Sequence, residues 1–319
     1  MAETGIPYCD RTWDLTIGCR KRSPGCDNCW ACRTVHRLAG RGLSGYEDQV
    51  ACTGGDWLFT SKVNCLVCNL SRPLHWRKPA FVFVNSKSDL FDERVPFEFI
   101  ARAFDVMCNC RQHRFMVLTK EPGRMAEFIE WYQQRRIPVW PDDFPHVILM
   151  VSVEGPEYIS RIETLRRIPA AMRGVSLEPL ISRVSDAVTP FIAGGYNVCP
   201  ACYWWGEDDG DPKHGQAYPC PKCGEDTDAV PLDELLDWVV VGCEKLAGGR
   251  AGRWTGIDPV NWWEEAQGIV TACRDAGVPV WMKQGPRVPP TGSRVRVTED
   301  AAEFPPECRI QEKPKGLRL

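Results

Sequence analysis

The sequence predicts an α/β fold, a partial or complete TIM-like (β/α) barrel that carries an inserted zinc-ribbon module. Two observations predict this fold. Nearly continuous apolar runs of strand length alternate with longer segments of helical periodicity, which is typical of parallel strands buried on both faces. A Gly-, Pro- and Cys-rich segment at 194–230 interrupts the alternation.

The expected strands extend along most of the chain. A short strand is expected at 11–17, and apolar runs follow it at 81–86, 115–120, 146–154, 173–181, 238–244 and 278–284. About seven parallel strands with right-handed connections are enough for a partial or complete barrel.

Amphipathic helices are expected between the strands, because apolar residues recur at helical spacing in four segments. These segments are 95–111, 123–136, 157–168 and 261–277. The expected organisation is a first part of the barrel at 1–193, the zinc ribbon at 194–230, the remainder of the barrel at 231–285 and an irregular C-terminal tail at 286–319.

Composition and charge exclude several classes of protein. The 319 residues are 44% hydrophobic and 25% charged, which excludes a wholly disordered chain. The net charge of −3 gives no general affinity for nucleic acid. No apolar run approaches the roughly 18 residues of a membrane span, and the first residues lack the pattern of a signal peptide. We therefore expect a cytoplasmic protein whose 17 cysteines bind metal more often than they form disulfides.

The inserted segment carries the strongest metal-binding motif. Two Cys-x2-Cys pairs, Cys199 with Cys202 and Cys220 with Cys223, stand 17 residues apart. Such pairs each direct two sulfurs at one tetrahedral Zn²⁺ ion. Because the protein supplies all four ligands, the expected role of this zinc is structural.

A second motif lies on the loop at 19–32, just after the first expected strand. Cys19, Cys26 and Cys29 have the spacing Cys-x6-Cys-x2-Cys. Three thiolates can hold a [4Fe–4S] cluster and leave its fourth iron open to a small molecule. The alternative is a zinc site that Cys32 or Cys9 completes.

Further cysteines could form an auxiliary zinc or iron–sulfur site. These are Cys32, Cys52, Cys65 and Cys68. The alternative is that they are small buried apolar residues.

The cysteine loop and six further motifs resemble an uncharacterised protein family that is encoded by phages and mobile elements and is known for a three-cysteine motif. The motifs are SDLF at 88–91, LTKEPGRM at 118–125, VSVE at 151–154, SLEPL at 176–180, VVVGCE at 239–244 and AGVPVWMKQ at 276–284. That family looks like a divergent branch of the radical S-adenosylmethionine (SAM) barrels, near the spore photoproduct lyase group. The resemblance covers about 8–285. It implies a [4Fe–4S] cluster on the three loop cysteines, SAM on the open iron and a 5′-deoxyadenosyl radical.

Charged residues end or follow the predicted strands, where barrel enzymes place their chemistry. They are Asp89, Lys120, Glu154, Glu178, Glu244 and Lys283. Glu154, Glu178 and Lys283 are the candidate catalytic residues. Candidate SAM contacts are Asp89, Lys120, Ser176 and Glu178, with Asp89 at the methionine ammonium and Ser176 at the ribose or amino group.

The sequence leads to one expected function and to an alternative from a different class. The first is a radical SAM-type enzyme that modifies or repairs a nucleic-acid base or nucleotide, with flavodoxin or ferredoxin as electron donor, in the host cytoplasm if a phage encodes it. The second is a non-catalytic zinc-binding adaptor that engages protein or DNA. Basic residues near the loop could attract a phosphate backbone or an acidic donor, or simply form a solvated face; they are Arg20, Lys21, Arg22, Arg33 and Arg37.

Overall fold

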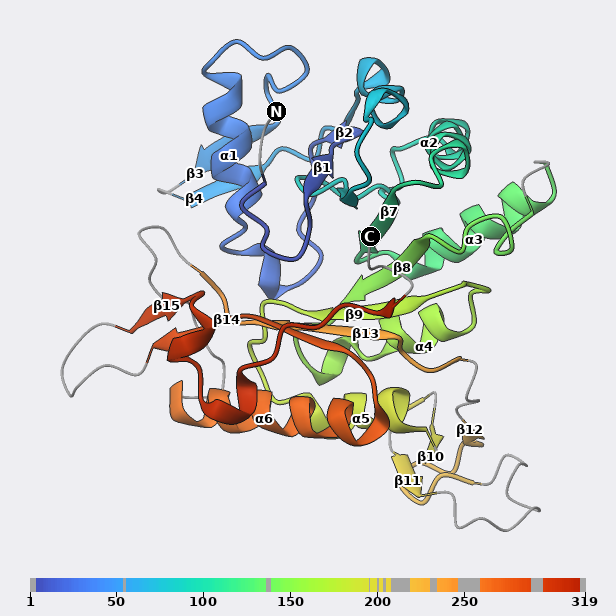
Figure 1. Ribbon diagram of the computed structural model, residues 1–319, viewed down its shortest axis with the longest axis vertical. Helices are drawn as coiled ribbons and strands as arrows, with labels where there is room; N and C mark the ends of the chain where they lie inside the picture. The colour runs from blue at the N-terminus through green and yellow to red at the C-terminus, as the bar shows by residue number, and fades with distance from the viewer. Residues whose placement is uncertain are drawn as a thin grey trace.

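The central element of the protein is an eight-stranded sheet (Figure 1). The computed structural model describes residues 4–53, 56–135, 139–194, 196–199, 201–202, 205–207, 219–229, 234–245, 259–287 and 295–315. The strands of this sheet are β1 (Arg11–Trp13), β6 (Phe81–Val84), β7 (Arg114–Thr119), β8 (Val147–Ser152), β9 (Arg173–Leu177), β13 (Trp238–Gly242), β14 (Val280–Arg287) and β15 (Arg296–Thr298).

The strand order confirms the predicted α/β fold with a largely parallel sheet. Neighbours pair in the order β1-β6-β7-β8-β9-β13-β14-β15. Every pair from β1 to β14 is parallel, and only β15 runs antiparallel to its neighbour. The seven parallel strands correspond to the short strand at 11–17 and the six apolar runs that the sequence indicates.

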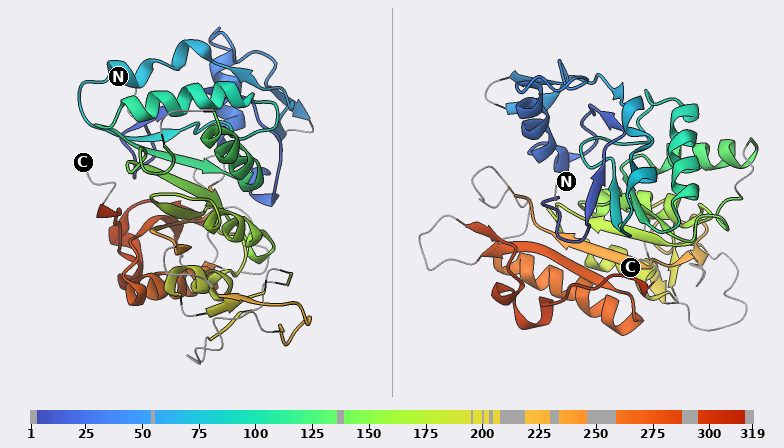
Figure 2. Two further views of the ribbon diagram at one scale, coloured as in Figure 1. Left: turned by 90° about the vertical axis from the view of Figure 1, so that its right-hand side faces the viewer. Right: turned by 45° about the horizontal axis from the view of Figure 1, so that its top comes forward.

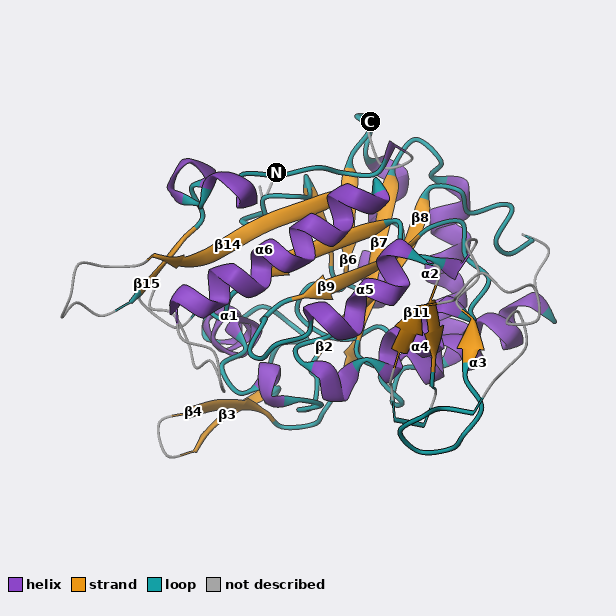
Figure 3. Cartoon of the chain, turned by 90° about the horizontal axis from the view of Figure 1, so that it is seen from below, coloured by secondary structure: helices purple, strands orange, loops and turns teal. Residues whose placement is uncertain are grey.

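Helices cover the outer face of this sheet (Figures 1 and 3). They are α2 (Phe97–Asn109), α3 (Pro122–Gln133), α4 (Ser160–Arg166), α5 (Ser185–Ala193) and α6 (Pro259–Ala276). Alternate strand residues such as Val82 and Val84 face these helices, and together they form the main hydrophobic core. Figure 2 shows α6 in orange beside β14 in both views.

The inner face of the sheet carries a second core, whose contacts show that the sheet is strongly curved. Phe81 of β6 and Trp238 of β13 have ring centroids 5.8 Å apart, although three strands separate β6 from β13 in the sheet. Tyr8, just before β1, also contacts Trp238 at 5.7 Å. In a flat sheet these strands would lie about 19 Å apart, at about 4.8 Å per strand.

The N-terminal part is more elaborate than the sequence indicates. The strand expected at 11–17 divides into β1 and β2 (Thr16–Ile17), and β2 pairs with β5 (Asn64–Cys65) in a separate sheet. A hairpin of β3 (Val50–Thr53) and β4 (Asp56–Phe59) packs on α1 (Trp30–Ala39). Asn85 causes the division, because its side-chain oxygen accepts hydrogen bonds from the backbone of Leu15 and Thr16.

The C-terminal tail is not wholly irregular, so that part of the prediction was wrong. β14 extends to Arg287 and pairs with β15 along its free edge. Further on, Gln311 bridges to Trp281, and the backbone oxygen of Glu312 accepts a hydrogen bond of 2.9 Å from the indole of Trp238. The tail therefore lies against the inner core.

The inserted segment forms a small antiparallel sheet of its own beside α5. Its strands are β10 (Tyr196–Val198), β11 (Trp205–Glu207) and β12 (Asp228–Ala229), in the order β11-β10-β12. Among the described residues, the helices are too short or too polar to cross a membrane.

Candidate functional site

A cavity of about 770 Å³ opens at the carboxyl ends of the parallel strands. Five of the side chains that the sequence singles out line it: Lys120, Ser176, Glu178, Glu244 and Lys283. They come from four different strands, β7, β9, β13 and β14, or from the residues that follow them. Because parallel strands end at one edge of a sheet, chain segments far apart in sequence meet here.

The cysteine loop folds over this edge, and the residues just before it fix its start. Thr16 shares a hydrogen bond of 2.7 Å with Ser88 after β6, and Gly18 bridges to the same residue. Gly18 has φ +100°, and a Cβ at this position would collide with the carbonyl oxygen of Lys62. Only glycine fits this turn without strain.

Lys120 and Glu154 connect the loop to the sheet. The Lys120 ammonium pairs with the Glu154 carboxylate and lies 2.9 Å from the Ser23 hydroxyl and 3.4 Å from the Cys26 sulfur. The Ser23 hydroxyl donates a 2.6 Å hydrogen bond to the same carboxylate. Burial would lower the pKa of Lys120, but the charges of Glu154 and Cys26 raise it. The ammonium therefore stays charged beside the thiol.

The loop cysteines gather near one another without forming a tight four-ligand group. Cys19 feels the charges of both Cys26 and Cys29, and burial raises its pKa. Cys32 lies buried in α1, and its hydrogen bond to Cys29 lowers the pKa of Cys29 to about 6. All four residues are described, yet no three of their sulfurs lie within 4.8 Å of one another. Cys29 alone among them lines the cavity.

Two predicted site residues lie beneath the loop instead of in the cavity. Glu154 is fully buried, and its second oxygen accepts a 2.9 Å hydrogen bond from Arg161. Asp89 accepts hydrogen bonds from the Thr119 hydroxyl and the backbone of Lys120, and burial raises its pKa. Since their oxygens are already occupied, this placement favours positioning roles over the expected catalytic and SAM-binding roles.

Within the cavity, polar side chains from different strands pair, and one ion pair spans β13, which lies between β9 and β14 in the sheet. Lys283 of β14 forms an ion pair with Glu178, which follows β9. Asn28 of the cysteine loop donates a 2.9 Å hydrogen bond to Glu244. The cavity wall therefore combines a thiol, paired charges and hydroxyls, a set that can hold a polar ligand with both amino and carboxylate groups.

Sequence reasoning named Arg33 and Arg37 as basic residues near the loop, but it missed Trp30 and the place of all three side chains in the cavity wall. Residues on α1 line the cavity opposite the strands, among them Trp30, Arg33 and Arg37. The signal was present, because these residues recur at intervals of three and four. The short α1 follows directly on the loop, and its Ala31, Cys32 and Val35 are buried on the other side.

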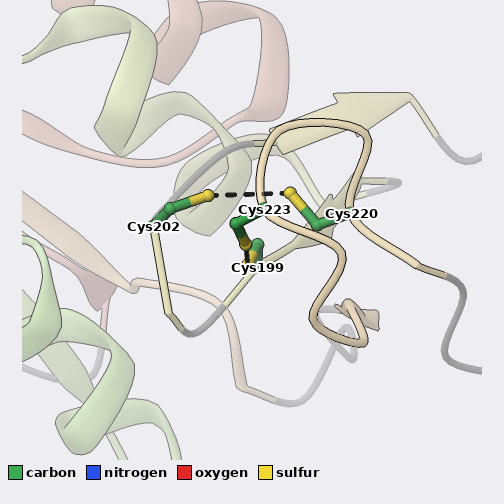
Figure 4. A group of neighbouring side chains, drawn as sticks. All are labelled: Cys199, Cys202, Cys220 and Cys223. Atoms are coloured by element: carbon green, nitrogen blue, oxygen red, sulfur yellow. Dashed lines mark hydrogen bonds between the residues drawn. The ribbon is translucent and has the colours of Figure 1, made fainter.

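The four cysteines of the inserted segment form a compact group (Figure 4). The sulfurs of Cys199 and Cys223 lie 3.5 Å apart, and those of Cys202 and Cys220 lie 3.6 Å apart. Zn–S bonds of about 2.3 Å in a tetrahedron place sulfurs about 3.8 Å apart. The group fits a metal ion such as zinc. Figures 1 and 2 show that this module lies away from α1.

A family model described as Protein of unknown function (DUF5131) matches residues 3–305. The chain belongs to this family. None of the curated proteins and none of the solved structures matches the chain. Because the family description states no activity, the phage and radical SAM resemblance remains a prediction.

The auxiliary cysteines do not converge. Cys52 and Cys68 are exposed, Cys65 is half-buried and Cys32 is buried. All four are described, and no three of their sulfurs lie within 4.8 Å of one another. The structure thus does not assemble them as ligands of a single ion.

Proposed function

We propose that the chain is an iron–sulfur enzyme of the radical SAM type, in which Cys19, Cys26 and Cys29 hold a [4Fe–4S] cluster and SAM occupies the adjoining cavity. One observation carries the proposal: Cys29 lines a cavity of about 770 Å³ at the carboxyl ends of the strands. We also propose that the curved sheet is an open form of the (β/α) barrel, a fold whose active sites lie at this end.

The arrangement of the thiols supports a cluster over a single ion. A mononuclear zinc site needs sulfurs about 3.8 Å apart, and no three loop sulfurs lie within 4.8 Å of one another. A [4Fe–4S] cluster binds each cysteine at a different corner, so it suits more widely spaced sulfurs. The Lys120 ammonium beside Cys26 offsets part of the negative charge that three thiolates bring.

The cavity residues suit the polar groups of SAM. Ser176 and Glu178 can accept hydrogen bonds from ribose hydroxyls or the amino group, and Lys283 orients Glu178 through their ion pair. Phe83 and Leu118 line the same cavity and help to exclude water. When bound, a reduced cluster and SAM would supply a 5′-deoxyadenosyl radical. A flavodoxin or ferredoxin is the proposed reductant.

Metal analysis of anaerobically purified protein tests the proposal. We expect about four irons per chain on the loop cysteines and one zinc on the inserted module. Replacing Cys19, Cys26 and Cys29 by Ala should remove the iron and leave the zinc. The matched control, Cys108→Ala with Cys110→Ala on α2 and directly after it, should retain both.

The zinc-binding adaptor is the second candidate, and the compact group of four cysteines favours it. The same metal analysis separates the two functions. Zinc bound at the loop cysteines, with no iron after reconstitution under anaerobic conditions, would exclude the radical SAM proposal and leave the adaptor.

A further inference from the structure

The face of α1 that lines the cavity carries positive charge that no described acidic residue pairs with. Arg33 and Arg37 are exposed and line the cavity. Neither side chain forms a hydrogen bond or ion pair with another described residue. Arg41 follows in the turn after α1 and is also exposed. Arg33 and Arg37 are four residues apart on α1, which places their Cα atoms about 6 Å apart along the helix axis.

The other basic residues near the loop are neutralised. Arg20 pairs with Glu93 at 2.6 Å, Lys21 with Asp27, and Arg22 with Glu121. These three therefore stabilise the loop, and little of their charge is available to attract a ligand.

The lysines that line the cavity are likewise paired. Lys87 pairs with Asp14, Lys120 with Glu154, Lys245 with Glu299 and Lys283 with Glu178. Among the described residues that line the cavity, the two arginines of α1 are thus the cations left for an anionic ligand.

An exposed aromatic side chain stands at the start of the same face. Trp30 is 49% exposed and lines the cavity three residues before Arg33. Nucleic-acid bases stack on exposed aromatic rings of this kind. Ala31, Cys32 and Val35 bury the opposite side of α1, so the aromatic and basic side chains share the outward face.

We propose that Trp30, Arg33 and Arg37 bind a single-stranded nucleic acid, with its phosphates on the two arginines and one base on the indole. The neighbouring nucleotide then enters the cavity. The proposed binding depends only on the side chains of Trp30, Arg33 and Arg37. The chemistry performed on the nucleotide in the cavity rests on the proposed function. The arginines line a concave wall, which admits a strand more readily than the convex surface of an acidic protein. A duplex would first have to release the base.

Fluorescence anisotropy of the full-length protein with labelled single strands of about 12 nucleotides, as DNA and as RNA, tests this assignment without SAM or turnover. We expect Arg33→Gln/Arg37→Gln to weaken binding at least about tenfold. In a plot of the logarithm of the binding constant against the logarithm of the salt concentration, the slope of this variant should be smaller in magnitude by about 1.4, because two phosphate contacts are lost. The matched control removes the same charge elsewhere: Arg77→Gln/Arg102→Gln, both exposed, should bind within about twofold of wild type.

The indole has its own test. Trp30→Ala should weaken binding about fivefold or more, and Trp30→Phe should restore most of it, because base stacking needs only an aromatic ring. Equal losses in the two arginine double variants, no binding by the wild type, or duplex binding as tight as single-strand binding would overturn the proposal.

Two further outcomes separate this proposal from docking of an acidic protein and from the proposed iron–sulfur function. If Arg33→Gln/Arg37→Gln slows reduction by flavodoxin but leaves oligonucleotide affinity unchanged, the face docks an acidic protein and the proposal is wrong. If strand binding depends on these arginines in a protein that binds no iron, the inference holds and the proposed function fails.

Discussion

The Lys120 ammonium lies 3.4 Å from the Cys26 sulfur. The same ammonium pairs with the fully buried Glu154, which also accepts hydrogen bonds from Ser23 and Arg161. One carboxylate at the end of β8 therefore holds the cysteine loop in place through two partners. Gly25 of the loop lies so close that a Cβ would come within 2.8 Å of the Glu154 side chain.

The first prediction follows from this contact. Glu154→Gln leaves Lys120 and Arg161 without their counter-charge, and breaking a buried pair from one side costs about 3–5 kcal/mol. We expect a lower free energy of unfolding in urea and a loop that loses iron on desalting. Glu157→Gln, an exposed neighbour, should change stability by less than about 0.5 kcal/mol. Normal iron retention in Glu154→Gln would mean that the carboxylate does not hold the loop.

Much of the fold follows from hydrophobic patterning. The buried apolar runs predict six of the seven parallel strands, because strands that are covered on both faces are largely apolar. The seventh, β1, was expected from the short segment 11–17, and only its Trp13 is buried. The spacing of Cys199, Cys202, Cys220 and Cys223 predicts the four-cysteine group, since such turns are local. The short pair β2–β5 carries no such signal, because a polar loop residue, Asn85, holds the backbone at Leu15 and Thr16.

The candidate site could be predicted only in part. A position at or just after the end of a predicted parallel strand identifies the correct edge of the sheet, and this rule found Lys120, Glu178 and Lys283, although β14 extends four residues beyond Lys283. The rule does not tell which of these side chains a loop from another part of the chain will cover. Asp89 and Glu154 lie under the loop for that reason, and only the three-dimensional course of the loop reveals it.

The second prediction concerns the inserted module. Cys199→Ser/Cys223→Ser should remove one zinc per chain and leave the iron in place, because the two sets of cysteines lie on separate parts of the fold. Trypsin should then cleave within the inserted segment faster, since such a small sheet depends on its metal. The Cys108→Ser variant serves as control. Loss of iron together with zinc would contradict the independence of the two sites.

The third prediction is a pH dependence of stability. His146 is buried, with Nε2 2.8 Å from the Met107 carbonyl oxygen, and burial lowers its pKa below the ordinary 6.5. The unfolded chain therefore takes up the proton first, so the stabilising effect is complete above pH 6.5 and is lost as the pH falls through the lowered pKa. The free energy of unfolding of the wild type, measured in urea, should therefore fall as the pH is lowered through this range.

A substitution isolates this effect. Aromatic rings of Phe115 and Phe144 surround His146, so His146→Phe should fit at a cost of about 1 kcal/mol for the lost hydrogen bond. Its stability should fall less steeply between pH 6.5 and the lowered pKa than that of wild type. The exposed His75→Phe should keep the wild-type dependence. Parallel curves for wild type and His146→Phe would assign the effect to other groups.

The last prediction concerns the open iron. If three thiolates hold the cluster, SAM should perturb the electron paramagnetic resonance spectrum of the reduced protein, because only an iron without a protein ligand can accept it. With dithionite, slow release of 5′-deoxyadenosine should follow without substrate. Lys283→Met, which breaks the pair with Glu178, should weaken the response to SAM while the iron content stays unchanged.

Cys32 decides whether that iron is open. It lies three residues after Cys29 and is hydrogen-bonded to it, but it is buried in α1 and faces away from the cavity wall that Cys29 lines. We therefore expect Cys32→Ala to keep its iron and its spectral response to SAM. Its Cys29 thiol should titrate at a higher pH in the metal-free protein, because the hydrogen bond that lowers the pKa of Cys29 is lost. If Cys32→Ala loses the cluster and the wild-type spectrum ignores SAM, then Cys32 is the fourth ligand. The cluster would then be closed, and this site could serve electron transfer or structure but not radical chemistry.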